Sequence, residues 1–281
     1  MTLSEVYREG LKVLQQANIE NAAFDNMSIF EHCFDLKRQD VSLYRENIAP
    51  AEKLEKFLLF INERKNGKPL QYILGHWDFM GRKFLVGQGV LIPRDDTEVL
   101  VNKALDLVKN KKNAKILDLC SGSGAVAILL ADILKTSEVT AVEVSDNAIE
   151  YLKENIKLNN ATNVLVKKLD ILNGDIPFLE KEFDLIVSNP PYIKSSEIKT
   201  LQKEVQFEPK LALDGGEDGL IFYKSIARRW KRFLTNDGSL CVEIGIGQDK
   251  EVASIFKNAG FLNVKTLRDI NGISRVVCAD N

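Results

Sequence analysis

Four consecutive residues, Asn189, Pro190, Pro191 and Tyr192, carry groups that suit a planar amino group. The amide oxygen of Asn189 and the backbone carbonyl of Pro190 are hydrogen-bond acceptors, and the ring of Tyr192 has a flat face. The two acceptors can hold the two hydrogens of an –NH2 group while the ring stacks on its plane. A strand-terminating turn is the plain alternative, because prolines alone are typical of one. The full combination is more specific and favours a site for a planar amino or amide nitrogen.

The run that precedes these residues predicts where they lie. Leu185, Ile186 and Val187 are continuously apolar, which is typical of a strand covered on both faces in a parallel sheet. A polar loop at the carboxyl end of such a strand is where open α/β sheets bind their ligands. We therefore expect a reactive loop here. Its predicted catalytic residues are Asn189, Pro190 and Tyr192, and its predicted substrate-binding residues are Asn189, Pro190, Pro191 and Tyr192.

A second candidate site lies upstream, at a glycine-containing turn. Gly122 and Gly124 allow a tight turn and close approach to a ligand, and the helix that follows attracts negative charge at its N-terminus. Glu143 ends the next predicted strand about twenty residues on, where a carboxylate can accept hydrogen bonds from ribose hydroxyls. The pattern fits a dinucleotide, and with Asp118 facing an ammonium group it also fits S-adenosylmethionine. Purely structural glycines are the plain alternative.

Two features favour S-adenosylmethionine. Asp170 follows the third predicted strand, where methyltransferases with an open α/β sheet have a residue close to the adenine amine of the cofactor. The Asn189 loop has no counterpart in a hydride-transfer site. S-adenosylmethionine is therefore the predicted cofactor. The residues expected to bind it are Asp118, Cys120, Ser121, Gly122, Ser123, Gly124, Glu143, Asp170, Ile171 and Asn189.

The elements that position these sites form an α/β domain. From residue 115 onwards, apolar runs alternate with amphipathic segments, which predicts βαβ units and a mostly parallel sheet. Strands are expected at 116–120, 139–143, 164–166, 185–187 and 239–243, with a closing antiparallel pair at 261–264 and 274–278. Helices are expected at 99–109, 125–134, 146–158 and through 223–230.

The residues before this domain predict two further parts. Residues 1–68 have helical periodicity throughout, and residues 69–90 predict a β-hairpin linker with strands at 71–75 and 82–86. Ten Lys/Arg against eleven Asp/Glu in residues 1–68 leave no basic stripe of the kind that reads nucleic acid. We expect a substrate-docking domain, with a stabilising cap as the alternative, ahead of a catalytic domain at 91–281.

Residues 91–98 lead into the first helix of the catalytic domain. Thr97 is expected to cap that helix, and Asp95, Asp96 and Glu98 suit the positive end of its dipole. Capping does not account for Arg94, which requires an acidic partner or a substrate.

Composition excludes several other classes of protein. Charged residues make up 28% of the 281 residues and the net charge is −2, so no overall charge draws the chain to nucleic acid or an anionic membrane. No apolar run reaches the roughly 20 residues that span a bilayer. Four separated cysteines and two histidines offer no paired metal or redox motif, so no metal site is expected. We expect a cytoplasmic monomer with no direct nucleic-acid or membrane partner.

Taken together, the motifs resemble those of peptide chain release factor glutamine methyltransferases over about residues 69–277. The resemblance rests on the segments 69–75, 92–94 with 97–98, 118–124, 189–193, 208–216 with 219–220, and 243–245 with Gln248. It implies a class I methyltransferase fold, Rossmann-like, with a seven-stranded mostly parallel sheet after a small helical domain. The implied reaction is N5-methylation of the glutamine in the Gly-Gly-Gln motif of bacterial-type class 1 release factors. Asp95 stands where the family usually has proline, and Cys120 where it often has glycine.

Three rival functions remain open from the sequence. A DNA or RNA amino-methyltransferase would use the same chemistry on a flipped base, and the balanced charge of residues 1–68 argues against it. A methyltransferase for a glutamine of another protein, such as a ribosomal protein, is the second. A non-catalytic binding protein is the third, although a scaffold has no need of the acceptors at 189–192.

Overall fold

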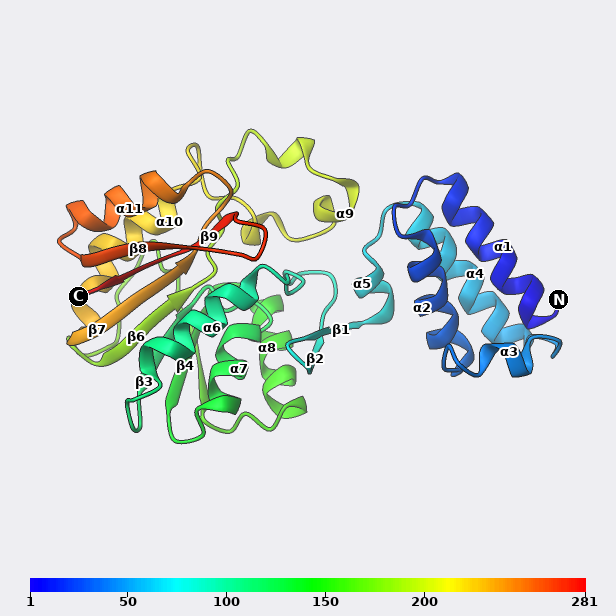
Figure 1. The fold of residues 1–281 in the computed structure, drawn as a ribbon, viewed down its shortest axis with the longest axis horizontal. Helices are drawn as coiled ribbons and strands as arrows, with labels where there is room; N and C mark the ends of the chain where they lie inside the picture. The colour runs from blue at the N-terminus through cyan, green and yellow to red at the C-terminus, as the bar shows by residue number, and fades with distance from the viewer. The chain divides into compact units, whose positions relative to one another are not determined.

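The computed structural model describes residues 1–281 and divides into two compact units (Figure 1). Unit 1 comprises Met1–His76 and Gln202–Phe207, and unit 2 comprises Trp77–Leu201 and Glu208–Asn281. None of the helices is both long enough and apolar enough to cross a lipid bilayer.

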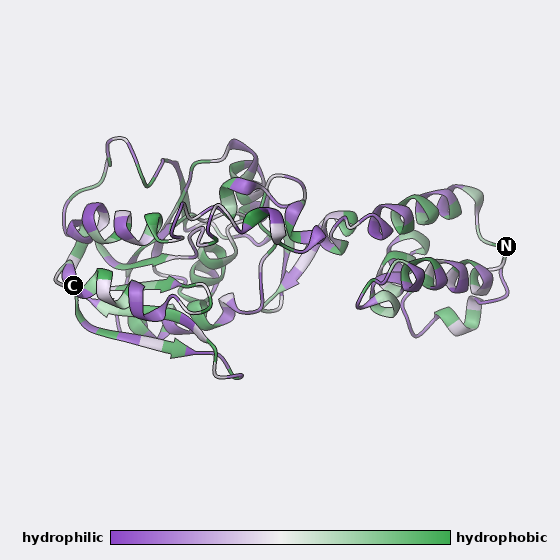
Figure 2. Ribbon diagram, turned by 90° about the horizontal axis from the view of Figure 1, so that it is seen from above, coloured by the Kyte–Doolittle hydropathy of each residue, from purple (hydrophilic) through white to green (hydrophobic).

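Unit 1 is built on three longer helices, α1 (Leu3–Gln16), α2 (Ala22–Phe34) and α4 (Ala51–Lys65), with the short helices α3 (Val41–Tyr44), α5 (Leu70–Leu74) and α9 (Lys203–Gln206). Thr2 begins α1 with a capping box, in which its hydroxyl accepts from the Glu5 N–H while the Glu5 carboxylate accepts from the Thr2 N–H. The fully buried rings of Phe30 and Phe57 meet edge to face at the centre of the unit, with centroids 5.8 Å apart. Figure 2 shows polar and apolar stretches alternating along these helices, as amphipathic helices around one core require.

Arg64 joins α9 to the rest of unit 1 through two ion pairs. The Arg64 guanidinium lies 2.6 Å from the Asp25 carboxylate and 3.0 Å from that of Glu204. Arg64 and Asp25 are almost wholly buried, so neither charge can lose its partner without a large desolvation cost. Residues 202–207 therefore belong to unit 1, although the chain on either side of them folds in unit 2.

The linker contains a hairpin, but the first strand predicted for it, at 71–75, is wrong. Residues 70–74 form helix α5, which starts after Pro69 and ends at Gly75 in the left-handed conformation. Proline before a first turn and glycine after a last one favour a short helix here over an extended segment. The hairpin pairs β1 (His76–Phe79) with β2 (Arg82–Leu85) around Gly81.

Unit 2 contains a seven-stranded sheet in the order β5-β4-β3-β6-β7-β9-β8. The strands are β3 (Lys115–Leu119), β4 (Glu138–Glu143), β5 (Val164–Lys168), β6 (Phe183–Ser188), β7 (Leu234–Glu243), β8 (Leu262–Arg268) and β9 (Ser274–Asp280). Neighbours among β3 to β7 are parallel, and β9 runs antiparallel to both β7 and β8. The expected mostly parallel sheet with a closing antiparallel pair is confirmed.

Helices cover both faces of the sheet (Figure 1). One face packs against α6 (Thr97–Val108), α7 (Ala125–Ile133) and α8 (Asp146–Leu158). The other face packs against α10 (Ile221–Ser225), the π-helical turn η3 (Ile226–Trp230) and α11 (Asp249–Asn258). The remaining short turns are η1 (Ile198–Thr200), η2 (Lys210–Ala212) and η4 (Lys231–Phe233).

A buried amide on α8 bonds strand β2 of the hairpin. The Asn155 side chain accepts from the Leu85 N–H at 2.6 Å and donates to the Leu85 carbonyl at 3.0 Å. It also donates to the Ser123 carbonyl at 2.9 Å, so the same amide supports the turn after β3. A single side chain thus joins the hairpin, α8 and the glycine-containing turn.

Candidate active site

The pairing register of the sheet places the ends of its four central strands side by side. One row of paired residues comprises Leu119, Val142, Ser188 and Val242. The next residues along these strands therefore emerge at one edge, and they are Cys120, Glu143, Asn189 and Glu243. This edge includes the point where strand order reverses beside β3, which is where open α/β sheets bind ligands.

A cavity opens at this edge of unit 2. It is lined by the turn after β3, the ends of β4 and β6, residues 89–97 and residues 209–212. The predicted site residues that line it are Asp118, Cys120, Ser121, Gly122, Ser123, Glu143, Asp170, Asn189 and Pro191. Four predicted site residues do not line it: Gly124, Ile171, Pro190 and Tyr192.

Asp118 presents an unpaired carboxylate oxygen to the cavity region. The residue is 1% exposed, and its Oδ2 atom has no hydrogen-bond partner in the protein. Burial raises the pKa of this carboxyl group from 3.8 to about 7. An unsatisfied buried carboxylate is costly to the fold, so its position at a cavity indicates a cationic ligand group.

Gly122 and Glu143 shape the floor of the cavity together. Gly122 has φ +54°, and a Cβ built on it would meet no atom within 4 Å, so the backbone faces open space there. The Glu143 Oε2 atom accepts from the Gly122 N–H at 2.9 Å, and Oε1 accepts from the Val144 and Ser145 N–H groups. Three bonds leave the carboxylate one of its about four lone-pair positions for a ligand hydroxyl.

Asp170 lines the cavity, whereas the Ile171 side chain is packed in the core and Gly124 allows two helices to pack closely. Asp170 accepts hydrogen bonds from the Leu172 N–H and the Asn173 side chain, which fixes the loop after β5. Ile171 is 4% exposed and lies in the core between the sheet and α10. A Cβ on Gly124 would come within 2.3 Å of Leu152, so this glycine allows α7 and α8 to approach.

Cys120 lies just beyond β3, not within the strand as predicted. Its φ is +61°, in the left-handed region that disfavours side chains. Glycine adopts this conformation without strain, which agrees with the glycine that the resemblance leads us to expect at this position.

Asn189 and Pro190 carry two acceptors that have no hydrogen-bond partner in the protein. The Asn189 Nδ2 donates to the Thr97 hydroxyl oxygen at 3.1 Å, and no hydrogen bond reaches its Oδ1. The Pro190 carbonyl likewise accepts none. Pro190 is buried and Asn189 is half-buried, so the loop is held in place while Asn189 lines the cavity.

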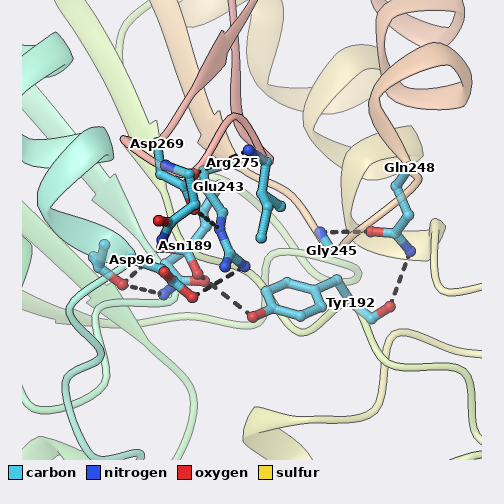
Figure 3. Close-up of polar contacts among 11 residues, drawn as sticks. Asp96, Asn189, Tyr192, Glu243, Gly245, Gln248, Asp269 and Arg275 are labelled. Atoms are coloured by element: carbon cyan, nitrogen blue, oxygen red, sulfur yellow. Dashed lines mark hydrogen bonds and ion pairs between the residues drawn. The ribbon is translucent and has the colours of Figure 1, made fainter.

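Tyr192 borders a second hollow rather than the first cavity. That hollow is lined by the segment after Tyr192, residues 217–220 and the turn after β7. The Gln248 side chain donates to the Tyr192 carbonyl at 3.0 Å and accepts from the Gly245 N–H at 2.9 Å (Figure 3). Asn189 and Pro191 therefore border the cavity that contains Asp118, and Tyr192 borders this hollow.

Thr97 and Glu243 are functional candidates that the sequence reasoning assigned otherwise. The expected cap is wrong, because Asp96 is the N-cap residue of α6 and the Thr97 hydroxyl donates instead to Glu243 Oε2 at 2.7 Å. The Asp96 carboxylate lies 3.0 Å from the Arg275 guanidinium (Figure 3). In the sequence, both residues belong to segments that carry the resemblance, 97–98 and 243–245.

Arg94 has the acidic partner that the sequence required. Its guanidinium pairs with Glu208, which is almost wholly buried and also accepts from the Ile92 N–H at 3.1 Å. Burial raises the pKa of Glu208 and the charge of Arg94 opposes the rise. The pair joins residues 92–94 to the segment that precedes Leu211, and both segments line the cavity.

Comparisons with known proteins agree with this geometry. Residues 5–75 match the family model of the PrmC N-terminal domain, and residues 95–217 match that of the methyltransferase small domain. A release factor glutamine methyltransferase of Thermodesulfovibrio yellowstonii is 41% identical over 250 residues, covering 87% of this chain and 88% of that protein. One from Clostridium botulinum is 37% identical over 281 residues, covering 99% of each.

The fold also resembles solved structures. A methyltransferase from Pyrococcus furiosus is 20% identical, with a TM-score of 0.51, and the match covers 72% of this chain and 90% of that one. The predicted class I methyltransferase fold is confirmed, and the predicted cofactor, S-adenosylmethionine, agrees with the methyltransferase family model that matches residues 95–217. Because these relatives are 37–41% identical over most of their length, the chain belongs to the release factor glutamine methyltransferase family.

Proposed function

We propose that this protein transfers a methyl group from S-adenosylmethionine to the side-chain amide nitrogen of the glutamine in the Gly-Gly-Gln motif of class 1 release factors. The observation that carries the proposal is the pair of free acceptors, Asn189 Oδ1 and the Pro190 carbonyl, beside Tyr192. A primary amide has two N–H hydrogens, so the two acceptors can hold it in one orientation. The relatives from Thermodesulfovibrio yellowstonii and Clostridium botulinum are release factor glutamine methyltransferases, which supports a release factor glutamine as the substrate.

The residues around the first cavity fit S-adenosylmethionine. Asp118 Oδ2 is buried and unpaired, as suits an ammonium group, and the remaining acceptor position of Glu143 suits a ribose hydroxyl. Asp170 lines the same cavity and is assigned to the adenine amine. Gly122 leaves room for the ligand because a side chain there would point into open space. When bound, S-adenosylmethionine supplies an electrophilic methyl group.

The residues of the reactive loop supply orientation and charge stabilisation. An amide nitrogen is a poor nucleophile because its lone pair is delocalised into the carbonyl. Hydrogen bonds to Asn189 and Pro190 orient the nitrogen and favour the positive charge that develops on it. The Tyr192 ring fixes the plane of the amide. The methylated nitrogen is acidic, so it can lose its proton afterwards without a strong base.

Unit 1 is assigned to docking of the release factor. Its surface carries exposed apolar side chains, among them Phe24 and Leu59, and it has no excess of basic residues. An apolar, charge-balanced surface suits a folded protein partner better than a nucleic acid.

The proposal is tested by incubating the protein with isotopically labelled S-adenosylmethionine and a purified release factor, and mapping the label by mass spectrometry. We expect the label on the glutamine of the Gly-Gly-Gln motif. A release factor with asparagine in place of that glutamine is the matched control and should take up no label. Label on added DNA or RNA, or on another residue of the factor, would contradict the proposal.

A further inference from the structure

Three side chains from separate elements form a chain of hydrogen bonds that ends at the reactive loop. Glu243 ends β7, Thr97 begins α6, and Asn189 follows β6. The Thr97 Oγ1 atom lies 2.7 Å from Glu243 Oε2 and 3.1 Å from Asn189 Nδ2. Figure 3 shows Asn189, Glu243 and Tyr192 converging from these elements.

The chemistry of the chain fixes the direction of each bond. An ionised carboxylate can only accept, so the Thr97 hydroxyl must donate its single proton to Glu243. The hydroxyl oxygen can then only accept from its other neighbour, Asn189. The amide of Asn189 must therefore turn its NH2 group to Thr97, which leaves Oδ1 for the substrate.

We propose that Thr97 and Glu243 are positioning residues that hold the Asn189 amide with its oxygen, and not its nitrogen, toward the substrate glutamine. This inference rests on the proposed function. Without the chain, the two ends of the amide are nearly equal in shape and either can face the substrate. With the NH2 group outward, Asn189 would offer a donor to the N–H hydrogens of the substrate, and the acceptor needed for catalysis would be lost.

Glu243 is placed to act on both sides of the reactive loop. Its Oε1 atom lies 3.5 Å from the Tyr192 hydroxyl, and its backbone carbonyl accepts from the Tyr223 hydroxyl at 3.0 Å. The other charged groups that act on it are Asp96 at the start of α6 and Arg275 on β9, which pair with each other. Glu243 is 2% exposed, so no water competes freely for its oxygens.

Protonation of Glu243 reverses the direction of the hydrogen bonds in this chain. Burial raises the pKa of its carboxyl group from 4.5 to about 7, against the hydrogen bond from Thr97, so the group takes up a proton as the pH falls through about 7. A protonated Glu243 can donate to Thr97, which frees the hydroxyl proton for Asn189 Oδ1. The amide would then turn its NH2 group outward, and catalysis would fall with acid.

The first test compares single-turnover methylation at saturating S-adenosylmethionine and pH 8 in three variants. Thr97→Val removes the hydroxyl and leaves the Asn189 NH2 group without its partner, so kcat should fall by about five- to a hundredfold, the range for an unsatisfied buried donor. Thr97→Ser restores the hydroxyl and should recover most of the loss. Thr140→Val changes a buried threonine on β4 that lines neither hollow and should leave kcat unchanged.

Two further readouts separate orientation from a merely structural role. At saturating cofactor, kcat of the parent should fall as the pH drops below about 7, which gives its pH profile an acidic limb. In Glu243→Gln, kcat should no longer depend on pH in this range, so the limb should be absent. In the cofactor-free protein, the side-chain 15N–1H signals of Asn189, assigned by their loss in Asn189→Asp, should shift in Thr97→Val. They should stay in place in Thr140→Val.

The outcomes distinguish this inference from the function on which it rests. If the parent does not methylate the glutamine, the proposed function fails. If the parent methylates it and Thr97→Val is within twofold of the parent, with the pH limb unchanged in Glu243→Gln, the function stands and the positioning role is wrong. Should Thr97→Val not fold, loss of the limb in Glu243→Gln supports the role and its persistence refutes it.

Discussion

The buried carboxylate of Asp118 makes cofactor affinity depend on pH. Burial raises its pKa from 3.8 to about 7, so in the free protein it is protonated below about 7 and ionised above. Only the ionised form attracts the ammonium group of S-adenosylmethionine. With a pKa of about 7, the ionised fraction falls about tenfold for each pH unit well below 7, and the dissociation constant should rise accordingly.

The same shift predicts the effect on stability. A carboxyl group whose pKa is raised in the folded state favours the fold below its unfolded pKa and loses that contribution as the pH rises toward the folded pKa. For Asp118, the free energy of unfolding should change by about 4 kcal/mol at most between low and high pH, at about 1.36 kcal/mol per unit of pKa shift. Asp118→Asn should therefore raise the melting temperature of the cofactor-free protein at pH 8, with no gain at pH 4.

Asp118→Asn should also weaken cofactor binding at pH 8 by about 1.5–3 kcal/mol, the range for a hydrogen bond to a charged group. Titration calorimetry between pH 5.5 and pH 8 is the assay, and the variant should lose the pH slope of the parent. Asp106→Asn, on the surface of α6 and far from the cavity lining, is the matched control and should keep both affinity and slope. A slope that persists in Asp118→Asn, or a flat parent profile, would remove Asp118 from the ammonium site.

Three further predictions concern the surrounding structure. Asp95 is exposed, its N–H donates no hydrogen bond, and it is the second residue of the turn closed by the Thr97 N–H. Asp95→Pro should therefore stabilise the protein by about 0.4–1 kcal/mol, measured by thermal unfolding. A loss of stability would show that the turn does not fit proline. Arg94→Ala should lower the melting temperature more at pH 8 than at pH 5, because it leaves the Glu208 carboxylate buried without a cation; equal losses at both pH values would count against the ion pair. Leu59→Asp should raise KM for the release factor with kcat and cofactor affinity unchanged; an unchanged KM would mean that this part of unit 1 does not dock the substrate.

Much of this fold could be predicted from the sequence because its signals are local. Continuous apolar runs such as 185–187 are typical of strands buried on both faces, and the structure has them there. A strand at 71–75 is the wrong prediction because the segment is too short for its apolar residues to show either the alternation of a strand or the periodicity of a helix. There the flanking Pro69 and Gly75 were the better guides.

The site was predictable in part, for a physical reason. Asp118, Gly122, Glu143 and Asn189 all lie at strand ends or turns, whose positions follow from the strand pattern. The bond from Thr97 to Glu243 joins residues that are 146 positions apart, because α6, which begins at Thr97, packs against the sheet in which Glu243 ends β7. No local pattern specifies such a contact, so the orientation of Asn189 could only be derived from the structure.

The central claim is that the Asn189 side-chain oxygen stabilises the substrate nitrogen in the transition state. Its most direct test is single-turnover methylation by Asn189→Ala and Asn189→Asp, measured together with cofactor affinity. Losing one preorganised partner costs roughly 2.7–4 kcal/mol in comparable sites, so the alanine variant should bind cofactor with modest loss and turn over about a hundred- to a thousandfold more slowly. The aspartate variant keeps an acceptor and should retain more activity than alanine. An alanine variant within tenfold of the parent rate would contradict the account, and Asn189 would then only end a strand.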